Sequence, residues 1–270
     1  MTEAPQDGSM VKSGEKTFEI VEILNRTDGA GVTEIAERMD VSKSTVYKHL
    51  QTLVTHDYAT KVDGEYRVGL RFLDHGIYAR QQQAIYRVSR DRIDELADET
   101  GELAWCQTHE NGRCVYLYGA AGMHSVHPPE RVGNRTPMHQ IAGGKAMLAH
   151  LPEERIAEII AQHGLEPATA HTITDREALF DELREIRERG VGYNREESTE
   201  GLYAVASAVL DPDGTVLGAI GLSGPKHRLE GELIETEFPE LLLGTANELE
   251  LNLEHQEFST DGGRSLVFER

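Results

Sequence analysis

The sequence predicts an α+β protein with two domains, and three observations carry this prediction. The chain has 270 residues, which is about twice the usual size of one domain. Apolar side chains at helical spacing, followed by a hairpin signal, occupy its first quarter. After residue 101 the pattern changes to strands interspersed with amphipathic helices. Only 39% of residues are apolar and the mean hydropathy is −0.46, which indicates a folded chain with a heavily charged surface.

The first domain, residues 13–75, is predicted to be three helices followed by a β-hairpin. Its helices are expected at residues 16–27, at residues 32–39 and after residue 42, and its strands within residues 57–69. Apolar side chains three and four residues apart give each helical segment one buried face. Thr33 and Ser42 are predicted N-caps, and Asp63-Gly64 is a turn typical of a hairpin. Residues 1–12 are predicted to be a disordered tail.

The second domain, residues 101–257, is predicted to follow a helical linker over residues 76–100, in which Gly76 is a candidate break. Two strands are expected first, at residues 103–109 and 113–121. Helices are then expected near residue 141, at residues 153–163 and at residues 174–190, and two buried strands flank a turn at residues 211–214. A closing helix is predicted to be kinked or interrupted at Pro239, and residues 258–270 are predicted to be a frayed tail.

The segment VSKSTVYKHLQTLVTH, residues 41–56, contains no Asp or Glu, although the chain has 47 acidic and 27 basic residues. Its apolar stripe leaves hydroxyl, amide and cationic side chains on the opposite helix face. Such groups bind phosphates and base edges, whereas a carboxylate would repel phosphate. The order helix, helix, turn, helix, hairpin is that of a winged helix-turn-helix. In this motif the helix after the turn, here the third helix, lies in the DNA major groove. We therefore predict double-stranded DNA as a partner, with a solvated helix in an unrelated domain as the alternative.

The candidate DNA-binding residues lie on the third helix, at its N-terminus and on the hairpin. Lysines would contact phosphate, Gln51 would pair with adenine, and the helix N-terminus at Ser42 would supply free N–H groups. The full set is Thr33, Ser42, Lys43, Ser44, Thr45, Tyr47, Lys48, Gln51, Thr52, Lys61 and Arg67.

The charge of the chain bears on this prediction in two ways. Residues 12–75 have nine basic and eleven acidic side chains, so the domain has a net charge of −2 within a chain of −20, a small electrostatic footprint for DNA binding. The dispersed carboxylates, with only seven Lys against twenty Arg, favour a halophilic source, because concentrated salt screens the self-repulsion. At high salt, counterion release contributes little to DNA binding, which weakens the objection.

Motifs in both halves of the chain resemble the IclR family of transcription regulators. TEIAERMDVSKSTVYKHLQTLVTHDYATKVDGEYRVGLRFLDHG resembles its DNA-binding domain. MHQIAGGKAMLAHLPEE, TITDREALFDELREIRERGVGYNREESTEGLYAVASAV and GAIGLSGPKHRL resemble its effector-binding domain, so that the resemblance covers about residues 14–255. It implies a winged helix, a linker helix and a GAF/profilin-like α/β domain that binds a small organic acid. It also implies a homodimer or dimer of dimers on a palindromic operator, acting as a repressor or activator of a catabolic operon.

The resemblance also implies an effector pocket in the second domain. In HQIAGGKAM, small residues begin a helix whose N–H groups can bind a carboxylate, although such a segment alone more often indicates tight packing. The implied positions are Ser125, Val126, Ala142, Gly143, Gly144, Asn194, Leu202, Ala204, Gly221 and Ser223. Asn194, Ala204 and Gly221 stand where the family often has Asp, Cys and Ser. These departures leave the identity of the effector open: it could be a 2-oxo acid, a sugar acid or an aromatic acid, or the pocket could bind no ligand.

An enzyme, or a scaffold that uses the helix-turn-helix only to dimerise, is the alternative. GLSGP has Pro225 where a nucleophile elbow needs Gly, and adjacent Glu196 and Glu197 are interpreted as solvated surface. No C-x-x-C or H-E-x-x-H spacing occurs, so neither a metal nor a cofactor is expected, and Cys106 and Cys114 are predicted to be reduced, buried thiols. With no apolar run long enough for a membrane span and a polar N-terminus, the chain is expected to be cytoplasmic, without a membrane partner.

Overall fold

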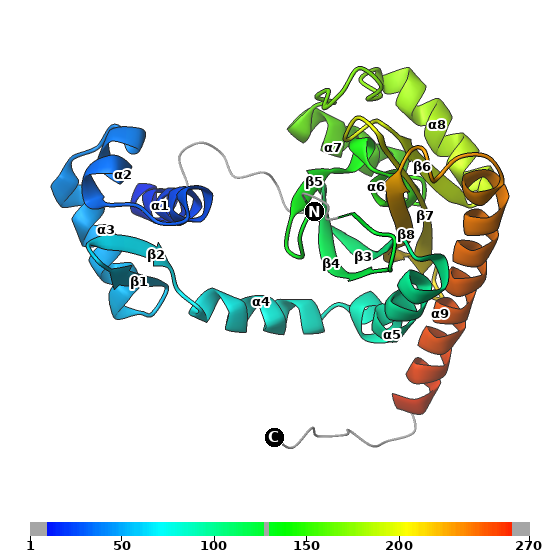
Figure 1. Ribbon diagram of the computed structural model, residues 1–270, viewed down its shortest axis with the longest axis horizontal. Helices are drawn as coiled ribbons and strands as arrows, with labels where there is room; N and C mark the ends of the chain where they lie inside the picture. Colours follow the sequence, from blue (N-terminus) through cyan, green and yellow to red (C-terminus); the bar gives the residue numbers. More distant parts are fainter. Residues whose placement is uncertain (1–9, 127–129, 261–270) are drawn as a thin grey trace. The chain divides into compact units, whose positions relative to one another are not determined.

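The computed structural model describes residues 10–126 and 130–260, which form two compact units, Met1–Ala79 and Arg80–Arg270 (Figure 1). The predicted tails fall largely outside the described residues, although the first helix begins at Lys12 and the last continues to Thr260. In the described part of the chain, no helix is both long and apolar enough to cross a membrane.

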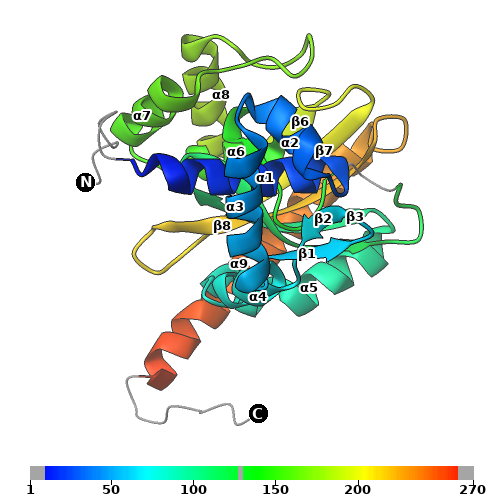
Figure 2. The same ribbon diagram turned by 90° about the vertical axis from the view of Figure 1, so that its left-hand side faces the viewer.

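The first unit has the predicted order of three helices and a hairpin. Its elements are α1 (Lys12–Thr27), α2 (Val32–Met39), α3 (Lys43–Thr55), β1 (Ala59–Val62) and β2 (Glu65–Val68). All of them contribute to one core, in which Ile35, Leu50 and Tyr66 are fully buried. Asp63 and Gly64 have φ angles of 51° and 90°, as a two-residue hairpin turn requires. Figure 2, in which this unit faces the viewer, shows α3 beside the hairpin, which confirms the winged helix-turn-helix.

The two predicted N-caps have different outcomes. Ser42 caps α3, since its Oγ accepts a hydrogen bond from the Thr45 N–H at 3.2 Å. The prediction for Thr33 is wrong: α2 already begins at Val32, its N-cap is Gly31, and Thr33 is an exposed residue of the first helical turn. The extended backbone of Gly31 turns the chain into the helix two residues before Thr33 could do so.

The predicted linker consists of two helices with a break at a different position. They are α4 (Arg71–Gln81) and α5 (Ala84–Thr100). Gly76 lies inside α4, and the helix stops after Gln81 instead. The inner face of α5, which includes Ile85, Ile93 and Leu96, is buried against the sheet of the second unit. Residues 84–100 are therefore part of the core of the second unit rather than a free linker.

In the described part of the chain, the second unit is built around one antiparallel sheet of six strands in the order β5-β4-β3-β8-β7-β6. The strands are β3 (Leu103–Glu110), β4 (Arg113–Ala121), β5 (Arg135–Pro137), β6 (Val191–Arg195), β7 (Leu202–Leu210) and β8 (Val216–Pro225). The helical segments are η1 (Met138–Gln140), α6 (Ala142–Leu148), α7 (Glu153–His163), α8 (Arg176–Arg189), η2 (Leu233–Glu237) and α9 (Phe238–Thr260). The helices α5 and α9 cover one face of the sheet, and α6, α7 and α8 cover the other (Figure 1). This arrangement confirms the α+β fold.

Three details of the second unit differ from the sequence-based expectations. β5 and β6 were not predicted, because one has only three residues and the other follows directly on α8 after Gly190. Pro239 is the second residue of α9 and follows a π-helical turn over Leu233–Glu237. The predicted irregularity is therefore this π-helical turn, which precedes Pro239 in a helical segment that is otherwise continuous from residue 232.

The two cysteines are buried, free thiols on neighbouring strands, as predicted. Cys114 pairs across the ladder with His109, and Cys106 pairs with Tyr118. Burial raises the pKa of the Cys106 thiol to about 12, so the reactive thiolate is suppressed.

Candidate functional site

The outer face of α3 presents hydroxyl and ammonium groups. Val46, Leu50 and Leu53 point into the core and fix the orientation of the helix. The residues that the structure leaves exposed on or beside the opposite face are Ser42, Lys43, Ser44, Tyr47, Lys48 and Thr52. This is the arrangement that the sequence predicted, and it leaves these groups accessible within their own unit.

Three hydroxyl groups are clustered at the N-terminus of α3. The Ser42 Oγ lies 2.9 Å from the Ser44 Oγ and 2.8 Å from the Thr45 Oγ1, in addition to capping the helix. Hydroxyls and the N–H groups of a helix N-terminus both bind phosphate oxygens. The start of α3 is thus preorganised for an anion, with Lys43 exposed beside it.

Gln51 and the hairpin residues are more constrained than the residues at the start of α3. Gln51 is half-buried, and its Nε2 donates to the Tyr66 hydroxyl at 3.4 Å. The Lys61 Nζ lies 5.1 Å from the centre of the Tyr66 ring. Arg67 lies 4.0 Å from Glu65, so part of its charge is compensated. Gln51 must therefore give up a weak hydrogen bond to read a base, whereas Ser44 and Lys48 are already exposed.

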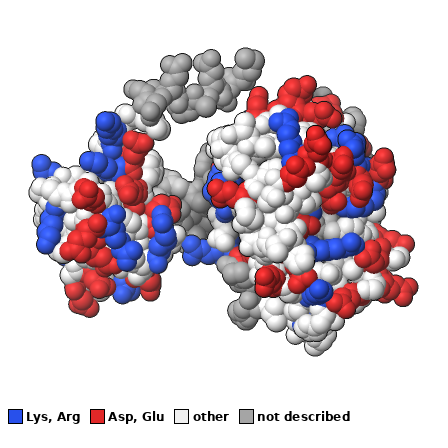
Figure 3. Space-filling view, turned by 90° about the horizontal axis from the view of Figure 1, so that it is seen from above, with Lys and Arg blue, Asp and Glu red and all other residues white. Residues whose placement is uncertain are grey.

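Charge is distributed differently over the two units. Figure 3 shows Lys and Arg side chains interspersed with Asp and Glu on the visible face of the first unit. The first unit is nearly neutral over residues 12–75, so the net charge of −20 belongs mainly to the rest of the chain. The uncharged and basic face of α3 is therefore a local property of one helix, as the acid-free sequence segment indicated.

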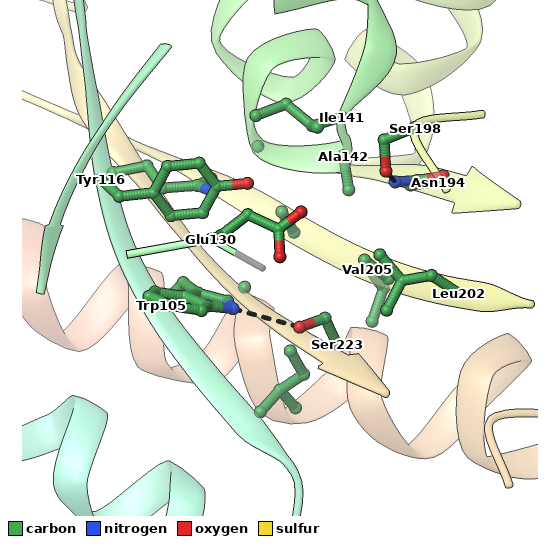
Figure 4. Close-up of a pocket in the computed structure, with 16 residues that line it drawn as sticks. Trp105, Tyr116, Glu130, Ile141, Ala142, Asn194, Ser198, Leu202, Val205 and Ser223 are labelled. Carbon is green, nitrogen blue, oxygen red and sulfur yellow. Dashed lines mark hydrogen bonds between the residues drawn. The ribbon is translucent and has the colours of Figure 1, made fainter. Parts of the chain in front are cut away.

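A cavity lies in the second unit between the sheet and the N-terminus of α6 (Figure 4). The space between its lining atoms amounts to about 400 Å³, including solvent at its open side. Its wall comes from β3, β4, β6, β7 and β8, from the residues around the start of α6, and from Glu130.

Seven of the ten residues predicted for the effector pocket lie together around this cavity. They are Ala142, Gly143, Asn194, Leu202, Ala204, Gly221 and Ser223. The other three are corrections: among the described residues, Ser125, Val126 and Gly144 are not part of the wall. Gly144 faces η1 instead, where an added Cβ would lie 2.2 Å from the Met138 carbonyl oxygen. The N–H of Ser125 bonds to the Gly122 carbonyl in a surface turn, and Val126 is about half exposed.

Three wall residues on β3 and β4 were not among the residues that the resemblance implied as effector contacts. Trp105 and Gln107 lie two apart on β3 and so share one face, and Tyr116 lies beside them on β4. The Trp105 Nε1 donates to the Ser223 Oγ at 3.1 Å, drawn in Figure 4, and its ring meets that of Tyr116 edge to face at 4.9 Å. The alternation of β3 was the available signal, but which face met the cavity depended on sheet pairing.

Gly143 allows α6 to approach the sheet closely. An added Cβ would lie 1.8 Å from the Gln107 Oε1, far inside van der Waals contact. A side chain here would displace Gln107 from the cavity wall. The close approach expected of AGGKA is therefore confirmed for Gly143, and it also places this residue in the cavity wall.

Asn194 has a structural role at the edge of the cavity. Its Nδ2 donates to the Ser198 Oγ at 2.7 Å, and its Oδ1 accepts the Glu197 N–H at 2.8 Å. Both polar atoms of the amide are thus engaged in holding the loop between β6 and β7. The hydroxyl groups of Ser198, Ser223 and Tyr116 are among the groups that this wall can offer to a ligand.

A buried ion-pair cluster joins Lys145 of α6, Glu182 of α8 and Glu197 of the loop between β6 and β7. The side chain of Lys145 is only 1% exposed, and its Nζ lies 2.5 Å from the Glu197 Oε2 and 3.6 Å from the Glu182 Oε1. Burial raises the pKa of Glu197, an effect that Lys145 opposes. The interpretation of Glu197 as solvated surface is therefore wrong. Glu196 is also paired, with its carboxylate 2.8 Å from the Lys226 Nζ.

Comparisons with known proteins match both units of the chain. The family model described as the IclR helix-turn-helix domain matches residues 13–63, and the one described as the bacterial transcriptional regulator IclR C-terminal matches residues 77–251. The chain is 33% identical to the HTH-type transcriptional regulator KdgR of Dickeya chrysanthemi over 81% of this chain and 72% of that one. It is 30% identical to a probable HTH-type transcriptional regulator, ArcR, of Halobacterium salinarum, over 87% of this chain and 91% of that one.

A solved structure shares the fold. It is an IclR homologue from Microbacterium hydrocarbonoxydans complexed with 4-hydroxybenzoate, with a TM-score of 0.75 and 21% identity over 90% of this chain and 99% of that one. The matched families and relatives are transcriptional regulators, not enzymes.

Proposed function

The chain belongs to the IclR family of transcriptional regulators, and we propose that it controls a catabolic operon by binding a palindromic operator through α3. A small organic effector, bound in the cavity of the second unit, is proposed to change the affinity for that operator. The observation that carries the first part is the exposed face of α3, which presents hydroxyls and lysines and is free of carboxylates. Phosphate and base edges require these groups.

A homodimer, or a dimer of dimers, is proposed because one α3 spans only one half-site. Helix-turn-helix proteins obtain affinity by placing two recognition helices about one DNA turn apart. An effector can alter that spacing only to the extent that it binds one arrangement of the protein better than another.

That the effector is an organic acid remains a prediction. One feature of the cavity favours an acid and another opposes it. The backbone N–H groups of Ala142 and Gly143 favour a carboxylate. The carboxylate of Glu130, which also lines the cavity, opposes one. That a homologue of the same fold was crystallised with 4-hydroxybenzoate supports a small carbon-based ligand of this size.

We also propose that the protein is adapted to concentrated salt. The grounds are its dispersed acidic residues and its similarity to a Halobacterium salinarum regulator. Screening over about 3 Å at 1 M salt would remove the self-repulsion of a chain with a net charge of −20. DNA binding should then be measured in concentrated potassium chloride.

Substitutions on α3 should separate phosphate contacts from base contacts. Lys48→Ala is expected to weaken binding to all DNA sequences. The plot of log association constant against log salt concentration should become less steep, by about 1 for each Lys48 that contacts phosphate. Gln51→Ala is expected to cost about 1–3 kcal/mol on the specific site only, with an unchanged salt slope. Both effects would be measured by gel shift and fluorescence anisotropy, with DNA from upstream of the protein's own gene and with unrelated DNA.

Arg184→Ala is the matched control, because it removes one charge from an exposed site on α8 of the other unit. It should leave DNA affinity unchanged. Equal losses of DNA affinity in Arg184→Ala and Lys48→Ala would mean that affinity depends on net charge alone. Wild-type affinity in both α3 variants would refute the assignment of this helix face to DNA binding.

Filling the cavity should abolish any stabilisation by an effector. Small carboxylates, sugar acids and their neutral counterparts would be screened by thermal shift, where saturation at a hundred times Kd adds about 2.7 kcal/mol. Ala204→Leu, which adds three carbons to the cavity wall, should remove that shift, whereas Ala161→Leu on the exposed side of α7 should retain it. Absence of a shift for every compound would contradict the proposed effector site.

A further inference from the structure

Glu130 brings a carboxylate into the cavity. It is half-buried, and Figure 4 shows its side chain pointing into the middle of the space, between Ala142 and Ser223. Among the described residues that line the cavity, Glu130 alone has a formally charged side chain. The Lys145 ammonium is paired with Glu197 and Glu182, so it compensates other carboxylates.

The polar groups around Glu130 are neutral and have limited capacity to offset a second negative charge. The Trp105 N–H already donates to Ser223, and the Asn194 amide is engaged with Ser198 and the Glu197 backbone. The negative charge of Glu130 also contributes to the raised pKa of the Tyr116 phenol, after the larger effect of burial. Tyr116 is therefore a neutral phenol in this environment.

The hydrogen-bonding chemistry points in the same direction as the charge. An ionised carboxylate can only accept hydrogen bonds, so it pairs well with an O–H or N–H donor and badly with another carboxylate. Two like charges a few ångströms apart in a partly buried site repel each other strongly, because little solvent lies between them to screen the interaction. A ligand that puts an amide, hydroxyl or amine beside Glu130 satisfies it, whereas an acid must displace it.

We propose that Glu130 is the specificity-determining residue of this cavity, and that it selects an uncharged ligand with hydrogen-bond donors over the corresponding carboxylate. The proposal rests on the proposed function, because it requires that the cavity binds an effector. The N-terminus of α6 alone would favour a negatively charged ligand, whereas Glu130 favours an uncharged one.

The test compares isosteric acid and amide ligands on the full-length protein and on Glu130→Gln. The probes are two pairs, 4-hydroxybenzoate with 4-hydroxybenzamide and lactate with lactamide, and their affinities would be measured by calorimetry. The wild type is expected to bind at least one amide about tenfold or more tightly than its acid. Glu130→Gln, which keeps the shape and removes the charge, should shift the acid-to-amide affinity ratio about tenfold or more towards the acid.

Glu154→Gln, an exposed carboxylate in the first turn of α7, removes the same charge far from the cavity wall and should leave the ratio unchanged. A wild-type preference for the acid, or an unchanged ratio in Glu130→Gln, would overturn the role of Glu130 while leaving the effector site intact. If none of the four probes binds to either protein, both the role of Glu130 and the proposed effector site for ligands of this size are overturned.

Discussion

Replacing Lys145 with Met is expected to lower the free energy of unfolding of the second unit by about 3–5 kcal/mol. Met fills nearly the same volume, so the loss comes from charge rather than from a cavity. Without the ammonium, the buried Glu197 carboxylate loses its cation at 2.5 Å and Glu182 loses one at 3.6 Å. Arg189 still contacts Glu182 at 2.7 Å, so the uncompensated charge is chiefly that of Glu197.

The measurement is urea unfolding followed by the fluorescence of Trp105, the single tryptophan, which lies in the second unit. Lys226→Met is the matched control, because Lys226 forms an ion pair of similar length with Glu196 while its side chain remains 43% exposed. The loss there should be about 1 kcal/mol or less. Adding Glu197→Gln to Lys145→Met should restore part of the lost stability. Equal losses for the two lysines would show that burial does not distinguish the pairs.

Leu50→Ala is expected to destabilise the first unit by about 2–5 kcal/mol. Leu50 is fully buried at the centre of a core to which three helices and the hairpin each contribute only a few side chains. A unit of this size has little stability in reserve, so a substantial unfolded fraction and weaker DNA binding should follow. The second unit has separate cores on the two faces of its sheet and should be unaffected.

Hydrogen exchange with mass spectrometry would check this by region. Amides of α1, α2 and α3 should exchange faster in Leu50→Ala, and those of β3, β7 and β8 should exchange as in the wild type. Leu70→Ala removes the same atoms from a leucine that is 83% exposed, and it should change neither region. Faster exchange throughout the chain would show that the two units unfold together.

Much of the first unit could be predicted because its signals are local. The apolar stripe of α3, the cap at Ser42 and the Asp63-Gly64 turn each occupy a few adjacent residues. The error at Thr33 was a displacement of two residues, since both Gly and Thr are acceptable N-caps and only the backbone path decides between them. α5 was predicted as a helix, but its burial against the sheet could not be predicted, because that depends on strands that come later in the chain.

The second site was predicted only in part. Small residues such as Ala142, Gly143 and Gly221 were placed by resemblance, and the structure puts them around the cavity. The roles of Glu130 and Glu197 were not predicted, because a carboxylate in so acidic a chain is usually solvated.

The sequence by itself determined the order of the elements in the first unit, the division into two units and the polar face of the recognition helix. Each of these follows from spacing within one segment, where backbone geometry turns residue number into direction. Only the tertiary structure decided which charges lie inside. The pairing of Lys145 with Glu197 joins segments about fifty residues apart, and the wall around Glu130 combines five strands with the start of α6. The free energy of a charge depends on the atoms that surround it in space, and these are set by packing between distant segments rather than by neighbours in the chain.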